Sequence, residues 1–175
     1  MRSLSDQLSQ YAAYHRDRRN ILTHFVGIPL IVLAVAMLLA RPVLSHWGGV
    51  ALSPATLVTA LTALYYLRLD LRLGAVMAVL LALCLWAAQS VAAQGTALWL
   101  TLGLGLFLLG WVIQFIGHFY EGRKPAFVDD IVGLLIGPLF VVAEVGFLLG
   151  LRRGLQHEIE ARVGPVREGP PAHAV

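Results

Sequence analysis

The sequence predicts an all-α protein, a multi-pass transmembrane helical bundle with four to six membrane helices. Hydrophobic residues make up 58% of the 175-residue chain and charged residues only 13%, and the mean hydropathy of +0.76 is far from that of a typical soluble domain. The apolar residues form long runs, several near the roughly 20 residues that a spanning helix needs: 25–40, 50–67, 74–93, 97–117 and 131–151. Because no polar alternation interrupts these runs, helices rather than strands should cross the bilayer.

The charged residues between the runs predict domain limits and orientation. Residues 1–151 contain every apolar run and should form one integral membrane domain, and residues 152–175 should form a polar, partly disordered tail. With a cytoplasmic amino terminus, only Arg41 faces outward across the first four crossings, as the positive-inside rule requires. The inward-facing cations are Arg2, Arg16, Arg18, Arg19, Arg68, Arg72, Arg123 and Lys124. The composition, rich in Ala, Leu and Arg, suggests a bacterial inner membrane.

The fifth run, residues 131–151, leaves its own topology open. A complete crossing would carry the arginines of the tail to the outer side, against the charge asymmetry. Gly133, Gly137 and Pro138 could instead break the run into two shorter helices that dip into the membrane and return.

Cysteine content and charge exclude several classes of function. Cys84 is the single cysteine, so the chain can form neither an internal disulfide nor a cysteine metal cluster. A metal would therefore depend on His, Asp, Glu or amide ligands. The net charge of +3 arises mainly from arginines in connecting segments, which membrane orientation explains. No aromatic-basic surface motif accompanies them, and no nucleic-acid partner is expected.

A polar stripe lies at the end of the fourth run. Gln114, His118 and Glu121 are spaced four and three residues apart, so they share one face of a helix. With a histidine from another helix, His118 and Glu121 would supply the two-histidine, one-carboxylate set that holds ferrous iron with positions open for oxygen and substrate. Alternatively, Glu121 forms an ion pair with Arg123 or Lys124 at the surface, and His118 forms a hydrogen bond with a neighbouring helix.

A second constellation precedes the first run. Asn20 either caps the first membrane helix or contacts substrate, and His24 lies where an imidazole lacks partners, which favours a ligand or catalytic role. His15 lies nine residues earlier, nearly opposite His24 on a continuous helix. His15 can join the site only if the chain bends, for example if a helix ends near Arg18 or Arg19 and another begins at Asn20.

Two carboxylates remain within or beside apolar runs. Glu144 lies in the middle of the last run, where a lone charge is penalised. It is therefore neutral and hydrogen-bonded to a neighbouring helix, or it meets a metal, an imidazole or an arginine. Asp70, between Arg68 and Arg72, is better interpreted as part of an ion pair than as part of a site.

Three motifs resemble those of the 2-hydroxy fatty acid dioxygenases, a family typified by a fungal endoplasmic-reticulum enzyme of phytosphingosine breakdown. The resemblance runs from about Tyr11 to Gly150. The motifs are Tyr14-His15 with Asn20, His24 and Gly27-Ile-Pro29; Gln114-Phe-Ile-Gly-His118-Phe-Tyr-Glu121-Gly-Arg-Lys-Pro125-Ala126; and Gly137-Pro138-Leu-Phe140 leading to Glu144.

This resemblance implies a non-haem Fe(II)-dependent dioxygenase within residues 1–151. The implied reaction is α-oxidation, in which O2 converts a 2-hydroxy fatty acid into a fatty acid one carbon shorter and CO2. It further implies His24, His118 and Glu121 as catalytic residues, and His15, His24, His118 and Glu121 as metal ligands. Substrate-contacting or supporting residues would be Asn20, Gln114, Glu144, Arg19 and Lys124.

The expected partners are thus the lipid bilayer, a 2-hydroxy fatty acid and O2; the oligomeric state stays open. The acyl chain should enter from the bilayer while its carboxylate stays at the cytoplasmic interface, where Arg19 and Lys124 are placed to attract it. A competing hypothesis is a small membrane transporter or proton relay that uses His24, His118 and Glu144 without a metal. A structural membrane adaptor would explain the apolar runs but not the motifs.

Overall fold

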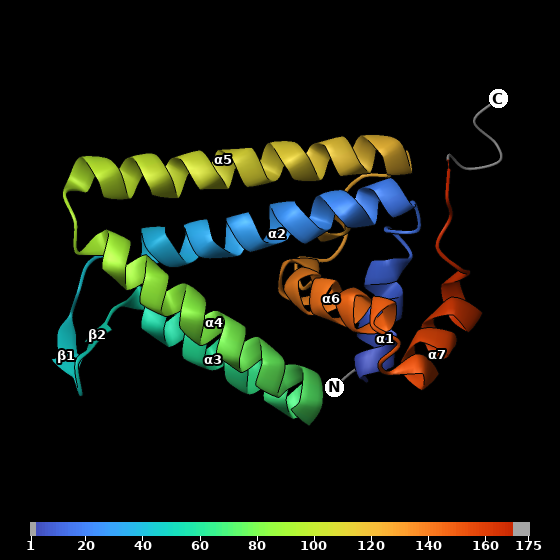
Figure 1. The fold of residues 1–175 in the computed structure, drawn as a ribbon, viewed down its shortest axis with the longest axis horizontal. Coiled ribbons are helices and arrows are strands. Elements are labelled where there is room, and N and C mark those ends of the chain that lie inside the picture. Colours follow the sequence, from blue (N-terminus) through green and yellow to red (C-terminus); the bar gives the residue numbers. More distant parts are fainter. Residues whose placement is uncertain (1–2, 170–175) are drawn as a thin grey trace. The chain divides into compact units, whose positions relative to one another are not determined.

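Helices dominate the computed structural model, which describes residues 3–169, and this confirms the predicted all-α class. The helices are α1 (Leu4–Ala12), α2 (Arg18–Leu39), α3 (Pro54–Leu69), α4 (Leu71–Ala92), α5 (Thr96–Glu121), α6 (Gly133–Leu148) and α7 (Arg153–Val163) (Figure 1). Strands β1 (Ser45–Trp47) and β2 (Val50–Leu52) form an antiparallel hairpin, and η1 (Ala126–Val128) is a 3-10 turn. The second apolar run therefore begins as a strand and becomes helical only at Pro54.

Three of these helices, α2, α4 and α5, are long and apolar enough to cross a membrane. A fourth span results if α6 and α7 together form one bent crossing. The contacts divide the chain into two compact units. Unit 1 comprises residues up to Ile28 and from Val112 onward, and unit 2 comprises Pro29–Trp111, so α2 and α5 contribute to both.

Unit 2 contains a tight hairpin of α3 and α4. Asp70 ends α3 and caps α4, because its carboxylate accepts hydrogen bonds from the backbone amides of Arg72 (3.0 Å) and Leu73 (2.9 Å). The sequence had suggested an ion pair for Asp70, and this role as a helix cap was not foreseen. One buried hydrophobic cluster of the unit consists of small residues and one methionine: Met37, Ala40, Ala55, Ala88 and Ala92.

Unit 1 contains the amino-terminal helix and both carboxy-terminal helices. Helix α1 packs against α6 and α7 (Figure 1). Its first turn carries a capping box, in which the Ser3 hydroxyl accepts from the Asp6 amide and the Asp6 carboxylate accepts from the Ser3 amide. Each of the three helices contributes an almost fully buried apolar residue: Leu8, Phe140 and Ile159.

Helix α6 is continuous through Gly137 and Pro138, so these two residues do not break the last run, which was one of the alternatives left open by the sequence. A proline removes one backbone donor, which a helix packed within protein tolerates. The break lies instead between α6 and α7, where the helix axes bend by 114°. Gly150 and Arg152 adopt positive φ values of 73° and 54° there, in the left-handed region that ends a helix.

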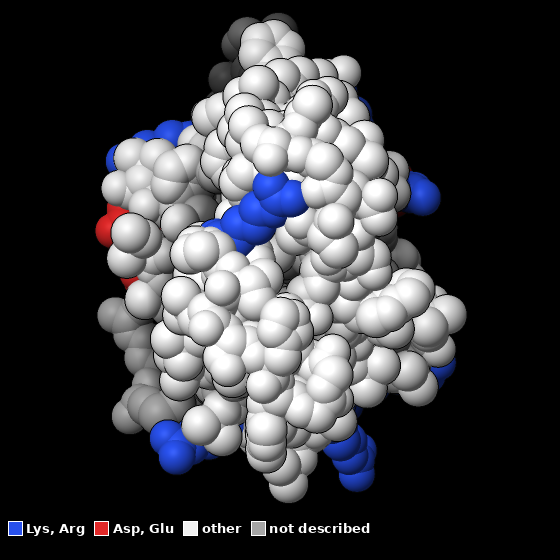
Figure 2. Space-filling view, turned by 90° about the vertical axis from the view of Figure 1, so that its left-hand side faces the viewer, with Lys and Arg blue, Asp and Glu red and all other residues white. Residues whose placement is uncertain are grey.

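Large apolar side chains stay exposed along the spanning helices. Trp86 on α4 is 71% exposed and Leu108 on α5 is 63% exposed. Apolar side chains exposed along these helices suit contact with lipid rather than water, in agreement with association of the protein with a membrane. Figure 2 views the molecule from the left-hand side of Figure 1, where β1, β2 and the start of α5 lie, and shows few charged side chains on that face.

Replacing Gly74 tests the α3–α4 hairpin. A Cβ at Gly74 would lie 2.6 Å from backbone atoms of Tyr66 and Leu67, so we expect Gly74→Ala to force the helices apart and to destabilise the protein by about 1–3 kcal/mol. Gly105→Ala is the matched control, because a Cβ there meets nothing within 4 Å and alanine favours helix by up to about 1 kcal/mol. The stability of each variant is measured as the SDS fraction at which half of the protein unfolds in mixed micelles. Equal midpoints for Gly74→Ala and Gly105→Ala would contradict the expectation.

Candidate metal centre

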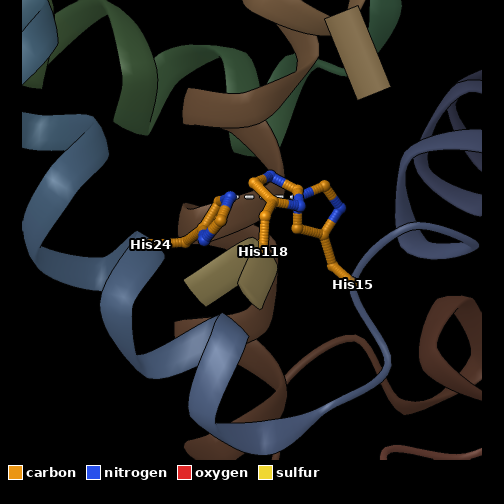
Figure 3. A group of neighbouring side chains, drawn as sticks. All are labelled: His15, His24 and His118. Atoms are coloured by element: carbon orange, nitrogen blue, oxygen red, sulfur yellow. Dashed lines mark hydrogen bonds between the residues drawn. The ribbon is translucent and has the colours of Figure 1, made fainter. Parts of the chain in front are cut away.

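Three buried histidines from the two sequence motifs meet within unit 1. His15 lies in the connection between α1 and α2, His24 lies on α2, and His118 lies in the last turn of α5. One ring nitrogen from each lies within 4.8 Å of the other two. The ring centroids are 4.4 to 5.1 Å apart, and Figure 3 shows the three rings turned toward one another. The three side chains could hold one metal ion.

A bend between α1 and α2 brings His15 to His24. Helix α1 ends at Ala12 and α2 begins at Arg18, so the chain does bend between the two histidines. The bend lies before Arg18, earlier than the expected break between Arg18 or Arg19 and Asn20. The expectation that Asn20 caps the membrane helix is wrong, because Asp17 takes that role and accepts a hydrogen bond from the Arg19 amide (2.9 Å). Aspartate caps a helix as well as asparagine does, and it precedes Asn20 in the chain.

The hydrogen bonds of two rings define which nitrogen carries the proton. Nδ1 of His15 is 2.7 Å from the carbonyl oxygen of Tyr11, and Nδ1 of His24 is 2.8 Å from the carbonyl oxygen of Asn20. A carbonyl oxygen can only accept, so both Nδ1 atoms are protonated and both Nε2 atoms carry lone pairs in the neutral rings. These two Nε2 atoms are 3.0 Å apart. Two facing lone pairs repel unless a proton or a cation lies between them. Imidazole rings that hold a metal have this arrangement, with one nitrogen donating to a carbonyl oxygen and the other facing the metal.

Burial keeps His15 in the neutral form that binds metals. Desolvation lowers the pKa of His15 well below its usual value, and the neighbouring rings of His24 and His118 act in the same direction. The Tyr11 ring stacks on the His15 ring at a centroid distance of 4.1 Å and an interplanar angle of 6°. Phe140 packs against the same ring at 5.7 Å. The orientation of His15 is therefore held by packing as well as by its hydrogen bond.

Gly117 allows α5 to approach α2 beside the histidines. A Cβ at this position would overlap Thr23 Oγ1 and lie 2.5 Å from Asn20 Oδ1. A larger residue would fit only if the Thr23 and Asn20 side chains, or the helices themselves, moved. Because Gly117 immediately precedes His118, this close approach places the His118 ring against the first turns of α2.

Glu121 lies one turn beyond His118, and hydrogen bonds engage both of its oxygens. Oε2 accepts from the Asp17 amide (2.7 Å) and from Asn20 Nδ2 (3.1 Å). Oε1 accepts from Arg167 Nη2 (2.7 Å), and the side chain is only 1% exposed. Within the part of the chain that the structure describes, the candidate ligand group thus consists of three histidines, and the assignment of Glu121 as a metal ligand stays a prediction. Glu121 forms its ion pair with Arg167, and not with Arg123 or Lys124, the two partners considered from the sequence.

Gln114 and Glu144 occupy buried positions near the site. Gln114 lies one turn before His118, and its Oε1 has no hydrogen-bond partner among residues 3–169. Glu144 pairs with Arg16 at 3.4 Å, and both side chains are largely buried, at 11% and 7% exposure. Among the partners considered for Glu144, the structure therefore favours an arginine.

Arg19 and Lys124 lie at the more exposed edge. Arg19 pairs with Asp17 (2.8 Å), and its guanidinium lies 4.6 Å from the centre of the Tyr120 ring. Lys124 pairs with Asp129 at 2.6 Å. Both cations already have carboxylate partners, so a bound anion would have to share them with those carboxylates.

Three residues that contact the site were missed at the level of sequence. Tyr11 lies four residues before His15, a helical spacing that could have indicated a contact. Asp17 precedes the helix directly, which is the usual signal for a cap. Arg167 is 46 residues from Glu121 along the chain, and no local pattern could have linked the two.

Breaking the buried Arg16–Glu144 pair should be costly. Glu144→Ala leaves the Arg16 guanidinium largely buried without its carboxylate, and we expect a loss of about 3–5 kcal/mol of stability. Glu158→Ala is the control, since it removes an exposed pair with Arg162 in the same unit and should cost less than about 1 kcal/mol. SDS-induced unfolding gives both values, and a small loss for Glu144→Ala would show that the pair contributes little.

Comparisons with known proteins identify the family of the chain. A family model described as 2-hydroxy-palmitic acid dioxygenase Mpo1-like matches residues 1–149. The 2-hydroxy-palmitic acid dioxygenase MPO1 of Saccharomyces cerevisiae is 31% identical over 165 residues, which cover 91% of each chain. No solved structure matches the chain significantly. On the family match and this identity, the chain belongs to the Mpo1-like family of 2-hydroxy-palmitic acid dioxygenases.

Proposed function

We propose that this protein is a non-haem Fe(II)-dependent dioxygenase that converts 2-hydroxy fatty acids to fatty acids one carbon shorter and CO2. The observation that carries the proposal is the convergence of two imidazole lone pairs at 3.0 Å beside a third buried ring. Membership of the family supports the substrate class and the use of O2. Zinc suits such ligands but has no redox chemistry, whereas iron offers both imidazole affinity and reactivity with O2.

The proposed reaction balances without a further reductant. A 2-hydroxy acid and O2 give the shortened acid, CO2 and water, so the substrate supplies all the electrons that reduce O2. The bond between C1 and C2 breaks, C1 leaves as CO2, and C2 becomes the new carboxyl carbon. A bound ferrous ion would supply the one-electron chemistry that lets O2 react with a closed-shell acid.

The histidines would hold the metal, and their neighbours would fix the geometry. The carbonyl groups of Tyr11 and Asn20 hold the His15 and His24 rings with Nε2 pointing toward the shared centre. His118 completes the set from α5. Glu121 suits a supporting role better than that of a fourth ligand, because three donors already engage its oxygens.

The buried residues around the rings suit a hydroxy acid. Oε1 of Gln114, which has no hydrogen-bond partner among the described residues, can accept a hydrogen bond from the 2-hydroxyl group. The Arg16–Glu144 pair supports the His15 segment, because Arg16 Nε donates to the His15 carbonyl (3.0 Å). Arg19 and Lys124 would draw the substrate carboxylate to this end of the helices by their positive charge.

The position of the site along the helices supports a membrane-interface location. His24 lies near the amino end of α2 and His118 near the carboxyl end of α5, next to the densest cluster of basic residues in the sequence. By the positive-inside rule this end faces the cytoplasm. We therefore place the site at the cytoplasmic face of a bacterial inner membrane, where an acyl chain can stay in the lipid.

Metal content and activity should depend on the same histidines. We expect purified protein to contain iron and to shorten 2-hydroxypalmitate under air. His24→Ala and His118→Ala should each weaken metal binding and lower turnover by more than about 100-fold, because each removes a donor from a buried site. His46→Ala is the control, since that exposed residue lies in β1 of unit 2. Full activity in both site variants, or an active protein without metal, would contradict the site assignment. A protein with neither metal nor turnover would favour a relay or an adaptor.

The products test the decarboxylating step separately. With carbon-13 at the carboxyl carbon of 2-hydroxypalmitate, all of the label should appear in CO2, with one O2 consumed for each CO2 and each pentadecanoate formed. Palmitate, which lacks the 2-hydroxyl group, should not react. An oxidised product that keeps the original chain length would mean that the enzyme does not break the bond between C1 and C2.

A further inference from the structure

The segment that follows α7 folds back over the connection that carries His15. The Arg167 amide donates to the Arg16 carbonyl (2.7 Å), and the Arg18 amide donates to the Arg167 carbonyl (2.9 Å). These two bonds form a parallel bridge on either side of Asp17. Arg16 Nη1 also donates to the Gly164 carbonyl (3.1 Å). We call residues 164–168 the C-terminal strap.

The strap supplies the cation for a buried carboxylate. Arg167 Nη2 lies 2.7 Å from Glu121 Oε1. The Glu121 side chain is 1% exposed and that of Arg167 is 37% exposed, so the arginine reaches inward from the surface. A buried carboxylate without a cation or full hydrogen bonding is strongly unfavourable. The partner therefore comes from a part of the chain that lies beyond the family match to residues 1–149.

Glu121 connects Arg167 to the segments that carry the histidines. It lies three residues after His118 on α5, and its Oε2 accepts from the Asp17 amide and from Asn20 Nδ2. The Asn20 carbonyl in turn accepts from His24 Nδ1. One carboxylate thus links the end of α5 to the start of α2.

We propose that Arg167 is a positioning residue of the metal centre and that the C-terminal strap holds the three histidine-bearing segments in register through Glu121. The inference rests on the proposed function, in which these histidines hold a metal. Arg167 does not itself reach the rings. It acts by fixing Glu121, which ties the His118 helix to the segment between His15 and His24.

The test is Co(II) binding to the full-length protein in detergent, followed by the visible absorption of the bound ion. Arg167→Ala should weaken Co(II) affinity by about 10–100-fold, the usual effect of losing a group that orients metal ligands. Arg167→Lys keeps the charge and should recover most of the affinity. Arg162→Ala is the matched control, because Arg162 lies on α7 and pairs at the surface with Asp6 and Glu158; it should bind Co(II) like the original protein.

A double variant tests the route through Glu121. Once Glu121→Gln has removed the carboxylate charge, adding Arg167→Ala should change Co(II) affinity by less than about threefold, because coupled residues are not additive. If Arg167→Ala does not fold, Arg167→Gln, which loses the charge but keeps a donor, is titrated instead. Affinity unchanged by loss of the Arg167 charge, or additive effects in the double variant, would overturn the proposal.

Amide hydrogen exchange separates failure of this inference from failure of the proposed function. In Arg167→Ala, exchange should accelerate in peptides covering residues 13–20, which contain the strap-bridged backbone, and should stay unchanged in α4. If the original protein binds neither Co(II) nor iron, the proposed function and the positioning role both fail. Accelerated exchange would then support only the mechanical role of the strap, and unchanged exchange would overturn that role too.

Discussion

The approach of two imidazole lone pairs is the constraint on which the rest of unit 1 depends. Nε2 of His15 and Nε2 of His24 lie 3.0 Å apart, although each ring already donates its Nδ1 proton to a backbone carbonyl. In a buried setting such a contact is repulsive until a cation joins it. The surrounding residues can be understood by how they keep the rings in this arrangement.

Three kinds of contact maintain the arrangement. Stacking of Tyr11 fixes the His15 ring, the absence of a side chain at Gly117 brings α5 against α2, and Glu121 joins the two helix ends by hydrogen bonds. Each contact alone is modest. Together they connect segments that are far apart in the chain, so the site is a property of unit 1 as a whole.

Two ion pairs of this unit extend below the surface, beside several exposed pairs. Arg16 with Glu144 and Arg167 with Glu121 are pairs in which at least one side chain is almost fully buried. Buried ion pairs contribute little net stability compared with apolar packing, but loss of one partner is severe. Such pairs therefore specify where the strap and α6 must lie more than they strengthen the fold.

The sequence by itself determined the all-α class, the apolar runs and the three histidines, because hydropathy and ionisable residues beside lipid are local signals. It misplaced the helix start at Asn20 and the break in the last run, because several residues with equal capping or breaking ability compete and packing chooses among them. Only the tertiary structure decided that His15 joins His24 and that Glu121 meets Arg167. Those contacts depend on a bend and on a strap 46 residues away, and no short-range pattern encodes them.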